Sequence, residues 1–554
     1  MAWDKNPQTR KQLESLVREG RVVELRRRLC SRMTFGTAGL RAEMGAGFAC
    51  INNLTIIQST QGMYKYLAKC FPDLKTRGLV VGFDTRAQTS SGCSSERLAR
   101  LTAAVMLCKD IPVYLFSTYV PTPFVPYAVM KYGAAAGVMI TASHNRKEDN
   151  GYKVYWHNGA QISSPHDKEI LRCIEESTEP WPESWNEDLV ESSSLRRDPL
   201  EDICCCYMEE LNTICFHREL NAKSPLKFVH SSFHGVGHNY VQRAFQQFGF
   251  PPPIPVPEQK DPDPDFSTVS CPNPEEGESV LELSLRLAER EEARIVVATD
   301  PDADRLAVAE QNDNWKVFTG NELAALLGWW MLFNWKEAHP DPADTERVYM
   351  LATTVSSKIL KAFARMEGFH FEETLPGFKW IGNRIHELTK TGKEGFCVGT
   401  WFLIRMESVQ QLLYGYHISR TAYVLCNDPP TIHRIFSRLR NFGGPGVYPE
   451  LCGDYCITHI RDVTTGYDSS QPDEKCVLPL SKNSQMVTFT FQNGIVATLR
   501  TSGTEPKIKY YTEFCAAPGE RDLSSLEKEL RKVTTALLEE FLEPDKNNLL
   551  RRSV

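Results

Sequence analysis

Residues 279–305 read SVLELSLRLAEREEARIVVATDPDADR, and they predict a helix, a buried strand and an acidic loop in that order. Ser279–Glu289 has the apolar spacing of an amphipathic helix. Arg294–Thr299 is a short run rich in β-branched residues, which is typical of a strand buried on both faces. A helix that leads into such a strand favours a doubly wound α/β sheet.

The same alternation of short apolar runs and helical stretches continues on both sides of this segment. Glu96–Leu107, for example, has helical spacing. Further runs with the composition of buried strands are Leu79–Phe83, Val113–Phe116, Ala136–Thr141, Lys227–His230 and Arg347–Leu351. We therefore predict α/β domains with mixed, largely parallel sheets.

The C-terminal part of the chain has a different pattern. Met486–Phe491 and Ile495–Leu499 are predicted strands, and residues 492–494 (Gln-Asn-Gly) between them are a hairpin signal. Ile508–Cys515 predicts a third strand and Ser524–Phe541 a long helix. This part is predicted to be an α+β domain with an antiparallel sheet.

The length and the proline-rich stretches indicate several domains. A chain of 554 residues is too long for one compact core. Candidate seams are Pro180–Pro199, Pro251–Pro274 and Cys426–Arg434. The second of these is long and proline-rich, and we predict a surface loop there.

Bulk composition excludes some classes of function. The net charge of −7 argues against broad electrostatic binding of nucleic acid. The longest apolar run, Leu323–Phe333, is about half the length of a membrane span, so it predicts a buried helix. The 17 scattered cysteines suit free thiols in a reducing compartment. We expect a cytoplasmic protein with no membrane partner.

A serine loop follows the predicted strand that ends at Ile140. The string Thr141-Ala142-Ser143-His144-Asn145 places a hydroxyl at the carboxyl end of a strand, where ligands collect in open α/β sheets. Such a hydroxyl can act as a nucleophile. A serine hydrolase is disfavoured, because its elbow needs glycines on both sides of the serine. An ordinary polar loop stays open as the alternative.

The acidic loop that follows Arg294–Thr299 predicts a metal site. Asp300, Asp302 and Asp304 repel one another unless a cation lies between them. Ligands that are all oxygen favour a hard ion such as Mg²⁺. A calcium EF-hand would need glycine and glutamate where this chain has Arg305 and Gln311.

Two further strings have the composition of anion-binding loops. Residues 500–507 (RTSGTEPK) combine hydroxyls, a glycine and a cationic fork between two predicted strands. Residues 35–41 (FGTAGLR) combine glycines with Arg41. For residues 500–507, a capped β-turn without a bound anion is an equally good interpretation. Residues 35–41 alone are weak evidence for an anion site. Residues 84–86 (Asp-Thr-Arg) are weaker still and suit a structural ion pair.

Taken in this order, the strings FGTAGLR, TASHN, DPDADR and RTSGTEPK resemble the four signatures of the α-D-phosphohexomutases. The resemblance extends over almost the whole chain, and it implies three related α/β domains followed by an α+β domain. We place these domains at residues 1–190, 191–320, 321–425 and 426–554.

The resemblance also implies residue roles. Ser143 would be phosphorylated and, with Asp300, Asp302 and Asp304, would hold Mg²⁺. His144, Lys153 and Arg41 would complete the catalytic group. Residues that would bind the substrate are Arg41, Arg305, Lys379, Arg500, Ser502, Gly503 and Thr504.

Within the family, two branches are open. Arg146 and Pro376, and strings such as ETLPGFKWIG (residues 373–382), are more like a branch that forms a sugar bisphosphate than like the mutases. The resemblance implies that this branch uses 1,3-bisphosphoglycerate as donor and a hexose 1-phosphate as acceptor. The alternative is a mutase acting on sugar 1-phosphates and 6- or 5-phosphates. We expect a monomer in either case.

One region departs from the family. Its third domain normally has a sugar-binding loop of the type FAFEE-[AS]-I-G, but Gly392-Lys393-Glu394 leads here into GFCVGTWFLIRMESVQQLLYGYH. We infer that a few tens of residues are missing and that Lys393–Gln411 is a poorly patterned insert. A catalytically impaired isoform with a binding or regulatory role is therefore a further hypothesis.

Overall fold

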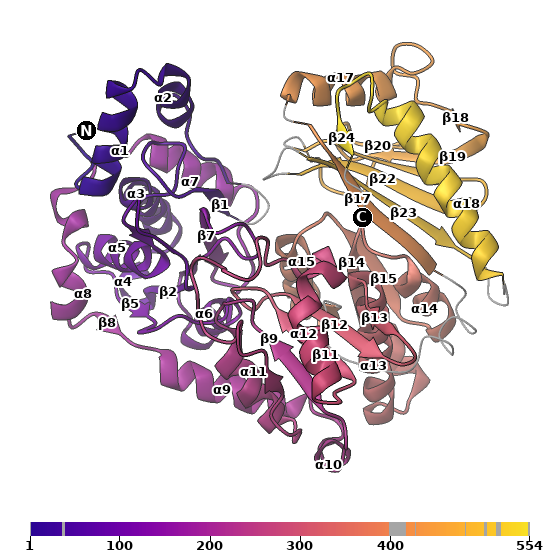
Figure 1. Ribbon diagram of the computed structural model, residues 1–554, viewed down its shortest axis with the longest axis horizontal. Coiled ribbons are helices and arrows are strands. Elements are labelled where there is room, and N and C mark those ends of the chain that lie inside the picture. Colours follow the sequence, from indigo (N-terminus) through magenta and orange to yellow (C-terminus); the bar gives the residue numbers. More distant parts are fainter. Residues whose placement is uncertain are drawn as a thin grey trace. The chain divides into compact units, whose positions relative to one another are not determined.

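The computed structural model describes residues 2–35, 39–397, 417–426, 428–481, 484–502, 507–516 and 522–551. The chain divides into two compact units, Met1–Gly320 and Asn321–Val554, and each is described by itself (Figure 1). Each unit contains two main sheets in its described part. Sheets with flanking helices and an antiparallel C-terminal sheet confirm the predicted α/β fold class.

The first sheet of unit 1 is mixed. Its strand order is β1 (Leu40–Glu43), β7 (Asp149–Trp156), β6 (Ala136–Ile140), β2 (Leu79–Phe83), β5 (Val113–Leu115) and β8 (Arg196–Arg197). The pairs from β6 to β8 are parallel, whereas β7 is antiparallel to β6 and to β1. Strand β8 lies past residue 190, so the predicted first domain ends too early for this sheet. The four-domain division itself stays a prediction.

Helices cover both faces of this sheet because its central strands are apolar on both sides. The helices of unit 1 that come before β9 (Phe228–Ser231) in the chain are α1 (Pro7–Arg18), α2 (Val22–Leu29), α3 (Asn53–Cys70), α4 (Leu74–Arg77), α5 (Ser95–Leu107), α6 (Phe124–Tyr132), α7 (His166–Glu175), α8 (Asp188–Ser192), α9 (Leu200–Thr213) and α10 (Arg218–Ala222). Leu79 and Val81 pack in one core with α3 and α5, and Val80 packs in another with α6 and α9. Alternate residues of β2 thus point to opposite faces, and the strand is buried along its length.

The second sheet of unit 1 has the order β10 (Ile254–Pro255), β9 (Phe228–Ser231), β11 (Ile295–Thr299), β12 (Leu306–Gln311) and β13 (Trp315–Val317). It is flanked by α11 (Gly237–Gln247) and α12 (Glu278–Arg290). The prediction of a surface loop over Pro251–Pro274 was wrong in part. This stretch forms β10 and buries Val256 and Phe266 in the core, because its few apolar side chains fill the space beside β9.

Unit 2 begins with a small parallel sheet. Its order is β15 (His370–Thr374), β14 (Val348–Thr353) and β16 (Glu394–Cys397), with helices α13 (Gly320–Ala338), α14 (Ile359–Glu367) and α15 (Phe378–Lys390). The predicted buried helix at Leu323–Phe333 lies within α13. Strand β16 shows that the expected insert Lys393–Gln411 begins with a regular strand; its residues 398–411 lie outside the described residues. No helix in the described part of the chain is long and apolar enough to cross a bilayer.

The C-terminal sheet of unit 2 is antiparallel. Its strands are β18 (Leu451–Cys452), β19 (Tyr455–Asp462), β21 (Met486–Phe491), β22 (Ile495–Thr501), β23 (Lys507–Cys515), β17 (His417–Leu425) and β24 (Leu550–Arg551), with β20 (Tyr467–Asp468) beside β19. The helices are α17 (Pro429–Arg440) and α18 (Leu523–Ala536), and a π-helical turn, Leu537–Leu542, extends α18. The predicted hairpin is β21–β22.

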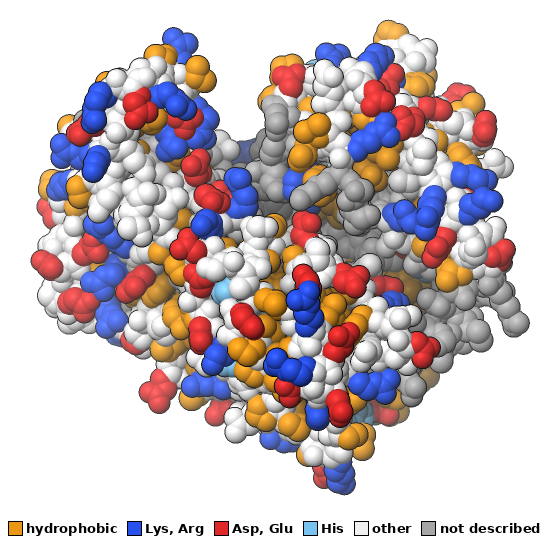
Figure 2. Space-filling model, in the orientation of Figure 1, with side chains coloured by type: hydrophobic (Ala, Val, Ile, Leu, Met, Phe, Trp, Pro, Cys, Tyr) orange, Lys and Arg blue, Asp and Glu red, His pale blue; other side chains and the backbone are white. Residues whose placement is uncertain are grey.

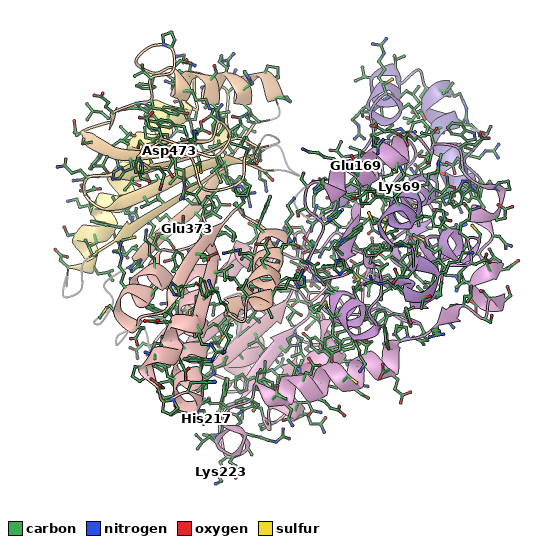
Figure 3. All side chains as sticks on the ribbon, turned by 180° about the vertical axis from the view of Figure 1, so that it is seen from behind. Lys69, Glu169, His217, Lys223, Glu373 and Asp473 are labelled. Atoms are coloured by element: carbon green, nitrogen blue, oxygen red, sulfur yellow. The ribbon has the colours of Figure 1, made fainter. Side chains whose placement is uncertain are left out.

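A partly buried double ion pair connects the two sheets of unit 2. Glu373 on β15, labelled in Figure 3, contacts Lys358 Nζ at 2.7 Å and Arg461 Nη1 at 2.9 Å. Burial alone would raise the pKa of Glu373, but these two cations outweigh it and lower the pKa to about 2. Surface charges elsewhere are mixed in sign: in Figure 2, positive and negative side chains alternate over the visible face of each unit.

This ion pair predicts an acid-dependent stability. A carboxylate whose folded pKa is depressed contributes stability that is present above its unfolded pKa and lost as the pH falls through the folded value. We expect Glu373→Gln to lower the free energy of unfolding by about 3 kcal/mol near neutral pH and by little near pH ~2. Urea denaturation over that pH range is the measurement. The exposed Glu450→Gln is the control, and equal losses at both pH values would contradict the assignment.

Candidate active site

Ser143 lies in the loop that follows β6, at the carboxyl end of the parallel strands of the first sheet. Its side chain is 1% exposed, and its backbone has the left-handed φ of 56°. The hydroxyl donates a hydrogen bond to Asp300 Oδ2 at 2.7 Å, and His144 Nδ1 lies 3.3 Å from Ser143 Oγ. The structure therefore brings the predicted serine loop and the predicted acidic loop together within unit 1.

The acidic loop follows β11 of the second sheet and is fixed by its own backbone. Asp300 Oδ1 accepts hydrogen bonds from the amides of Asp304 and Arg305, at 3.1 and 2.9 Å. A neighbouring loop packs closely on it: a Cβ added at Gly235 would lie 2.2 Å from the Cα of Pro301, so only glycine fits there. The fixed loop holds the carboxylates of Asp300, Asp302 and Asp304 close together.

Lys153 reaches the same carboxylates from the first sheet. Its Nζ donates to Asp302 Oδ2 at 2.6 Å and to Asp304 Oδ2 at 2.7 Å. Lys153 belongs to the buried strand β7, which is not among the strands predicted from the sequence. The strand pairs with β1 through Asp149–Tyr152 and with β6 on its other side, where Lys153 lies opposite Met139.

Arg41 enters the site from β1. It lies opposite Gly151 of β7, and its Nη1 donates to Asn145 Oδ1 at 3.2 Å. Burial and the nearby charge of Arg305 lower the pKa of Arg41, while Asp302 and Asp304 oppose that effect. Gly39 permits the close approach to β7, because a Cβ there would lie 2.3 Å from the Tyr152 carbonyl oxygen. Residues 36–38 of the FGTAGLR string lie outside the described residues.

The electrostatics of the three carboxylates suit a cation. Burial, with the charges of Asp302 and Asp304, raises the pKa of Asp300 well above its usual range. Burial would also raise the pKa of Asp302, but Lys153 outweighs it and lowers that pKa. One oxygen of each carboxylate lies within 4.8 Å of the others, and the buried Asp302 Oδ1 has no hydrogen-bond partner among the described residues. A hard divalent ion fits this donor set.

Two supporting residues were missed by sequence reasoning. Thr122 donates to Asp302 Oδ2 at 2.6 Å, and its amide donates to the Asp302 carbonyl at 2.8 Å. Arg86 is 1% exposed, and its guanidinium donates to the carbonyls of the serine loop at residues 143, 145, 146 and 149, at 2.6–3.0 Å. Asp84 pairs with Arg86 Nε at 3.3 Å. The sequence predicts an ion pair within residues 84–86. It does not predict the hydrogen bonds from Arg86 to the carbonyls of the serine loop.

The remaining predicted residues lie in unit 2. Lys379 is the second residue of α15, with its Nζ 5.5 Å from the Trp380 ring centroid. Arg500 belongs to β22, which extends to Thr501. The amide of Ser502, directly after β22, donates to the carbonyl of Lys507, the first residue of β23, at 2.9 Å. Gly503 and Thr504 lie outside the described residues.

Comparisons with known proteins agree on one family. Models described as "Phosphoglucomutase/phosphomannomutase, alpha/beta/alpha domain I" and "domain II" match residues 32–181 and 206–314. The chain is 67% identical to the Homo sapiens glucose 1,6-bisphosphate synthase, over 100% of this chain and 95% of that protein. It is 53% identical to the Homo sapiens phosphopentomutase, over 99% and 96%.

The fold and the length can be compared in the same way. A crystal structure of a phosphoglucomutase/phosphomannomutase family protein from Burkholderia thailandensis superposes with a TM-score of 0.61 at 16% identity, covering 92% of this chain and 99% of that one. The alignment with the synthase extends over 590 positions, although this chain has 554 residues. The synthase therefore carries a few tens of residues that this chain lacks.

Proposed function

Because the chain belongs to the phosphoglucomutase/phosphomannomutase family, we propose that it transfers a phosphoryl group from 1,3-bisphosphoglycerate, through Ser143, to a hexose 1-phosphate. This is the reaction of a glucose-1,6-bisphosphate synthase-like phosphotransferase. The higher identity to the synthase than to the phosphopentomutase supports this choice. The observation that carries the proposal is the 2.7 Å contact between the Ser143 hydroxyl and Asp300, inside a cluster of three carboxylates.

We assign Mg²⁺ to Ser143 and the three aspartates, where it would neutralise charge on the transferring phosphoryl group. Ser143 Oγ attacks the donor phosphorus, the bond from that phosphorus to the acyl oxygen breaks, and 3-phosphoglycerate leaves. In the second step a hydroxyl of hexose 1-phosphate attacks the phosphorus, the bond to Ser143 Oγ breaks, and the proton of the sugar hydroxyl restores the serine. His144, 3.3 Å from the hydroxyl, is placed to accept its proton. Lys153, whose pKa is raised by Asp302 and Asp304 against the effect of burial, stays protonated and supplies charge or a proton.

The phosphate of the sugar substrate that does not react needs a separate binding site. We assign it to Arg500, Ser502, Gly503 and Thr504, and we assign the sugar to Lys379. Arg41 and Arg305 lie beside the three carboxylates and supply positive charge near the transferring group. Binding the distant phosphate helps to orient the reacting end. The proposal further places a monomeric enzyme in the cytoplasm.

Product analysis tests the proposed reaction. The full chain is incubated with hexose 1-phosphate and either 1,3-bisphosphoglycerate or glucose 1,6-bisphosphate as donor. A synthase forms sugar bisphosphate with the first donor. Formation of hexose 6-phosphate only, and only with the second donor, would favour the mutase that the phosphopentomutase relatives suggest.

A catalytically impaired isoform is the second candidate, and the missing residues favour it. If the lost segment carries the sugar-binding loop, the acceptor is held mainly by its phosphate, and productive orientations become rare. Labelled 1,3-bisphosphoglycerate separates the two cases. Label that stays on serine after hexose 1-phosphate is added supports the impaired isoform, whereas transfer to sugar supports the synthase.

Arg86 predicts a positioning effect on the reaction. Lysine cannot reproduce a planar fork that donates to four carbonyls, so Arg86→Lys should let the serine loop shift. We expect phosphorylation of Ser143 to slow by ~100-fold with an unchanged dependence on Mg²⁺ concentration. Rapid-quench labelling is the measurement, and Arg97→Lys, at a half-exposed ion pair, is the control. Loss of stability with normal kinetics would make Arg86 merely structural.

Arg500 predicts an effect confined to the sugar half-reaction. A charge-assisted contact to phosphate contributes about 1.5–3 kcal/mol, so Arg500→Ala should raise the KM for hexose 1-phosphate by roughly 10- to 150-fold. Phosphorylation of Ser143 by the small donor acetyl phosphate should change little. The exposed Arg531→Ala is the control. Equal losses in both half-reactions would place Arg500 at the reacting centre.

A further inference from the structure

Unit 2 contains a cluster of three different metal-ligating side chains, His417, Glu513 and Cys515. Strands β17 and β23 are antiparallel, with His417 opposite Cys515 and Ser419 opposite Glu513. Residues two apart on a strand share a face, as do residues directly opposite each other. The three side chains therefore lie on one face, and a ring nitrogen, a carboxylate oxygen and the sulfur all lie within 4.8 Å of one another.

The spacing of this cluster suits a small tetrahedral ion. His417 Nδ1 and Glu513 Oε1 are 3.3 Å apart, and their side chains are 6% and 8% exposed. Two ligands at the usual zinc bond lengths of about 2.0–2.2 Å are roughly 3.3–3.6 Å apart in a tetrahedron. The two atoms already have the separation that such a site needs.

The carboxylate of Glu513 is oriented by groups outside the cluster. The amide of Lys358 donates to Oε2 at 2.9 Å, and the Ser357 hydroxyl donates to Oε1. Both residues directly precede α14, one of the helices described above with the parallel sheet of unit 2. Outer partners of this kind fix the direction of a ligating carboxylate. Oε1, which accepts from Ser357, is also the oxygen that lies beside His417.

We propose that His417, Glu513 and Cys515 form a binding site for a thiophilic divalent cation, with Zn²⁺ as the best match. Nitrogen and sulfur donors favour Zn²⁺ and disfavour Mg²⁺, in contrast to the three oxygen donors of Asp300, Asp302 and Asp304. Three protein ligands leave a fourth position for water or another small ligand. A bound ion would join β17 to β23 and, through Glu513, to the start of α14.

Cobalt titration of the full chain tests the site. The protein is stripped with chelator and titrated with Co²⁺ in excess Mg²⁺, which occupies oxygen-only sites. The expected result is a thiolate-to-cobalt charge-transfer band that Zn²⁺ abolishes. Cys515→Ser should remove the band, and His417→Gln should weaken binding by at least ~10-fold. Cys456→Ser, on β19 of the same sheet, is the matched control and should change nothing.

Thermal denaturation with and without Zn²⁺ is a second test, which remains informative if the Cys515→Ser variant folds poorly. Zn²⁺ should raise the Tm of the wild type and of Cys456→Ser, but not that of His417→Gln, which keeps the thiol. The proposal is overturned if the wild type shows no thiolate band, or if the band persists with the same midpoint in Cys515→Ser and His417→Gln. It is equally overturned if Zn²⁺ raises the Tm of His417→Gln as much as that of the wild type.

Discussion

Ser143→Ala is expected to abolish the uptake of a phosphoryl group from 1,3-bisphosphoglycerate. The hydroxyl is buried at the end of β6 and contacts Asp300 at 2.7 Å, so it is held directly beside the carboxylate cluster. Alanine removes one oxygen and leaves the packing of the loop unchanged, since Arg86 grips carbonyls and not the side chain. The fold should therefore survive. Intact-mass measurement after donor treatment gives the result directly.

The control for this experiment is Ser192→Ala, at an exposed serine on α8. It should gain one phosphate as the wild type does, and both variants should have wild-type circular dichroism. A Ser143→Ala chain that still gains one phosphate would show that another residue accepts the group. The roles proposed for the carboxylates and for Lys153 would then also be wrong, because they assume that Ser143 is phosphorylated.

Asp302→Asn is expected to slow phosphoryl transfer by at least ~100-fold and to raise the Mg²⁺ concentration needed for half activity, because several kcal/mol of charge stabilisation depend on the ion. Asparagine can still accept from Thr122 and Lys153, so the local hydrogen bonds survive. What it loses is one of the negative charges that hold the cation. Activity titrated against Mg²⁺ is the measurement.

Asp313→Asn, in the exposed turn between β12 and β13, is the matched control because it removes the same charge at the opposite end of β12 from the acidic loop. Its Mg²⁺ titration should superpose on that of the wild type. If Asp302→Asn also gives an unchanged titration, the three carboxylates are not the metal site. A lower rate with an unchanged midpoint would instead assign Asp302 to holding Lys153.

Much of the fold could be predicted from the sequence because the core strands carry strong local signals. Leu79–Phe83 and Met486–Phe491 have the predicted bounds as strands, since each is a short apolar run between clear breaks. Strand β7 was missed because Asn150 and Gly151 have low strand propensity. Its pairing with β1 and β6 overrides that propensity, and such long-range pairing has no local signature.

In the candidate site, too, the residues with a local sequence signal were predicted, and the contacts between distant segments were not. Ser143 and the aspartates could be singled out because each follows a predicted strand, where ligands collect. That Ser143 contacts Asp300, 157 residues away, could not be predicted from spacing, because it depends on how two sheets pack. Arg86 and Thr122 were missed for the related reason that their roles lie in contacts with distant backbone. The roles assigned to the site residues themselves stay predictions.

The contact of Lys153 with Asp302 also bears on the order of events during synthesis. The ammonium is 1% exposed, and its carboxylate partner is encoded 149 residues later. At usual translation speeds the partner emerges roughly 7–30 seconds after the lysine. Until then the charge has no counter-ion in this site, and burying it alone would be costly. Final burial of Lys153 on β7 is therefore expected to wait for synthesis of the acidic loop.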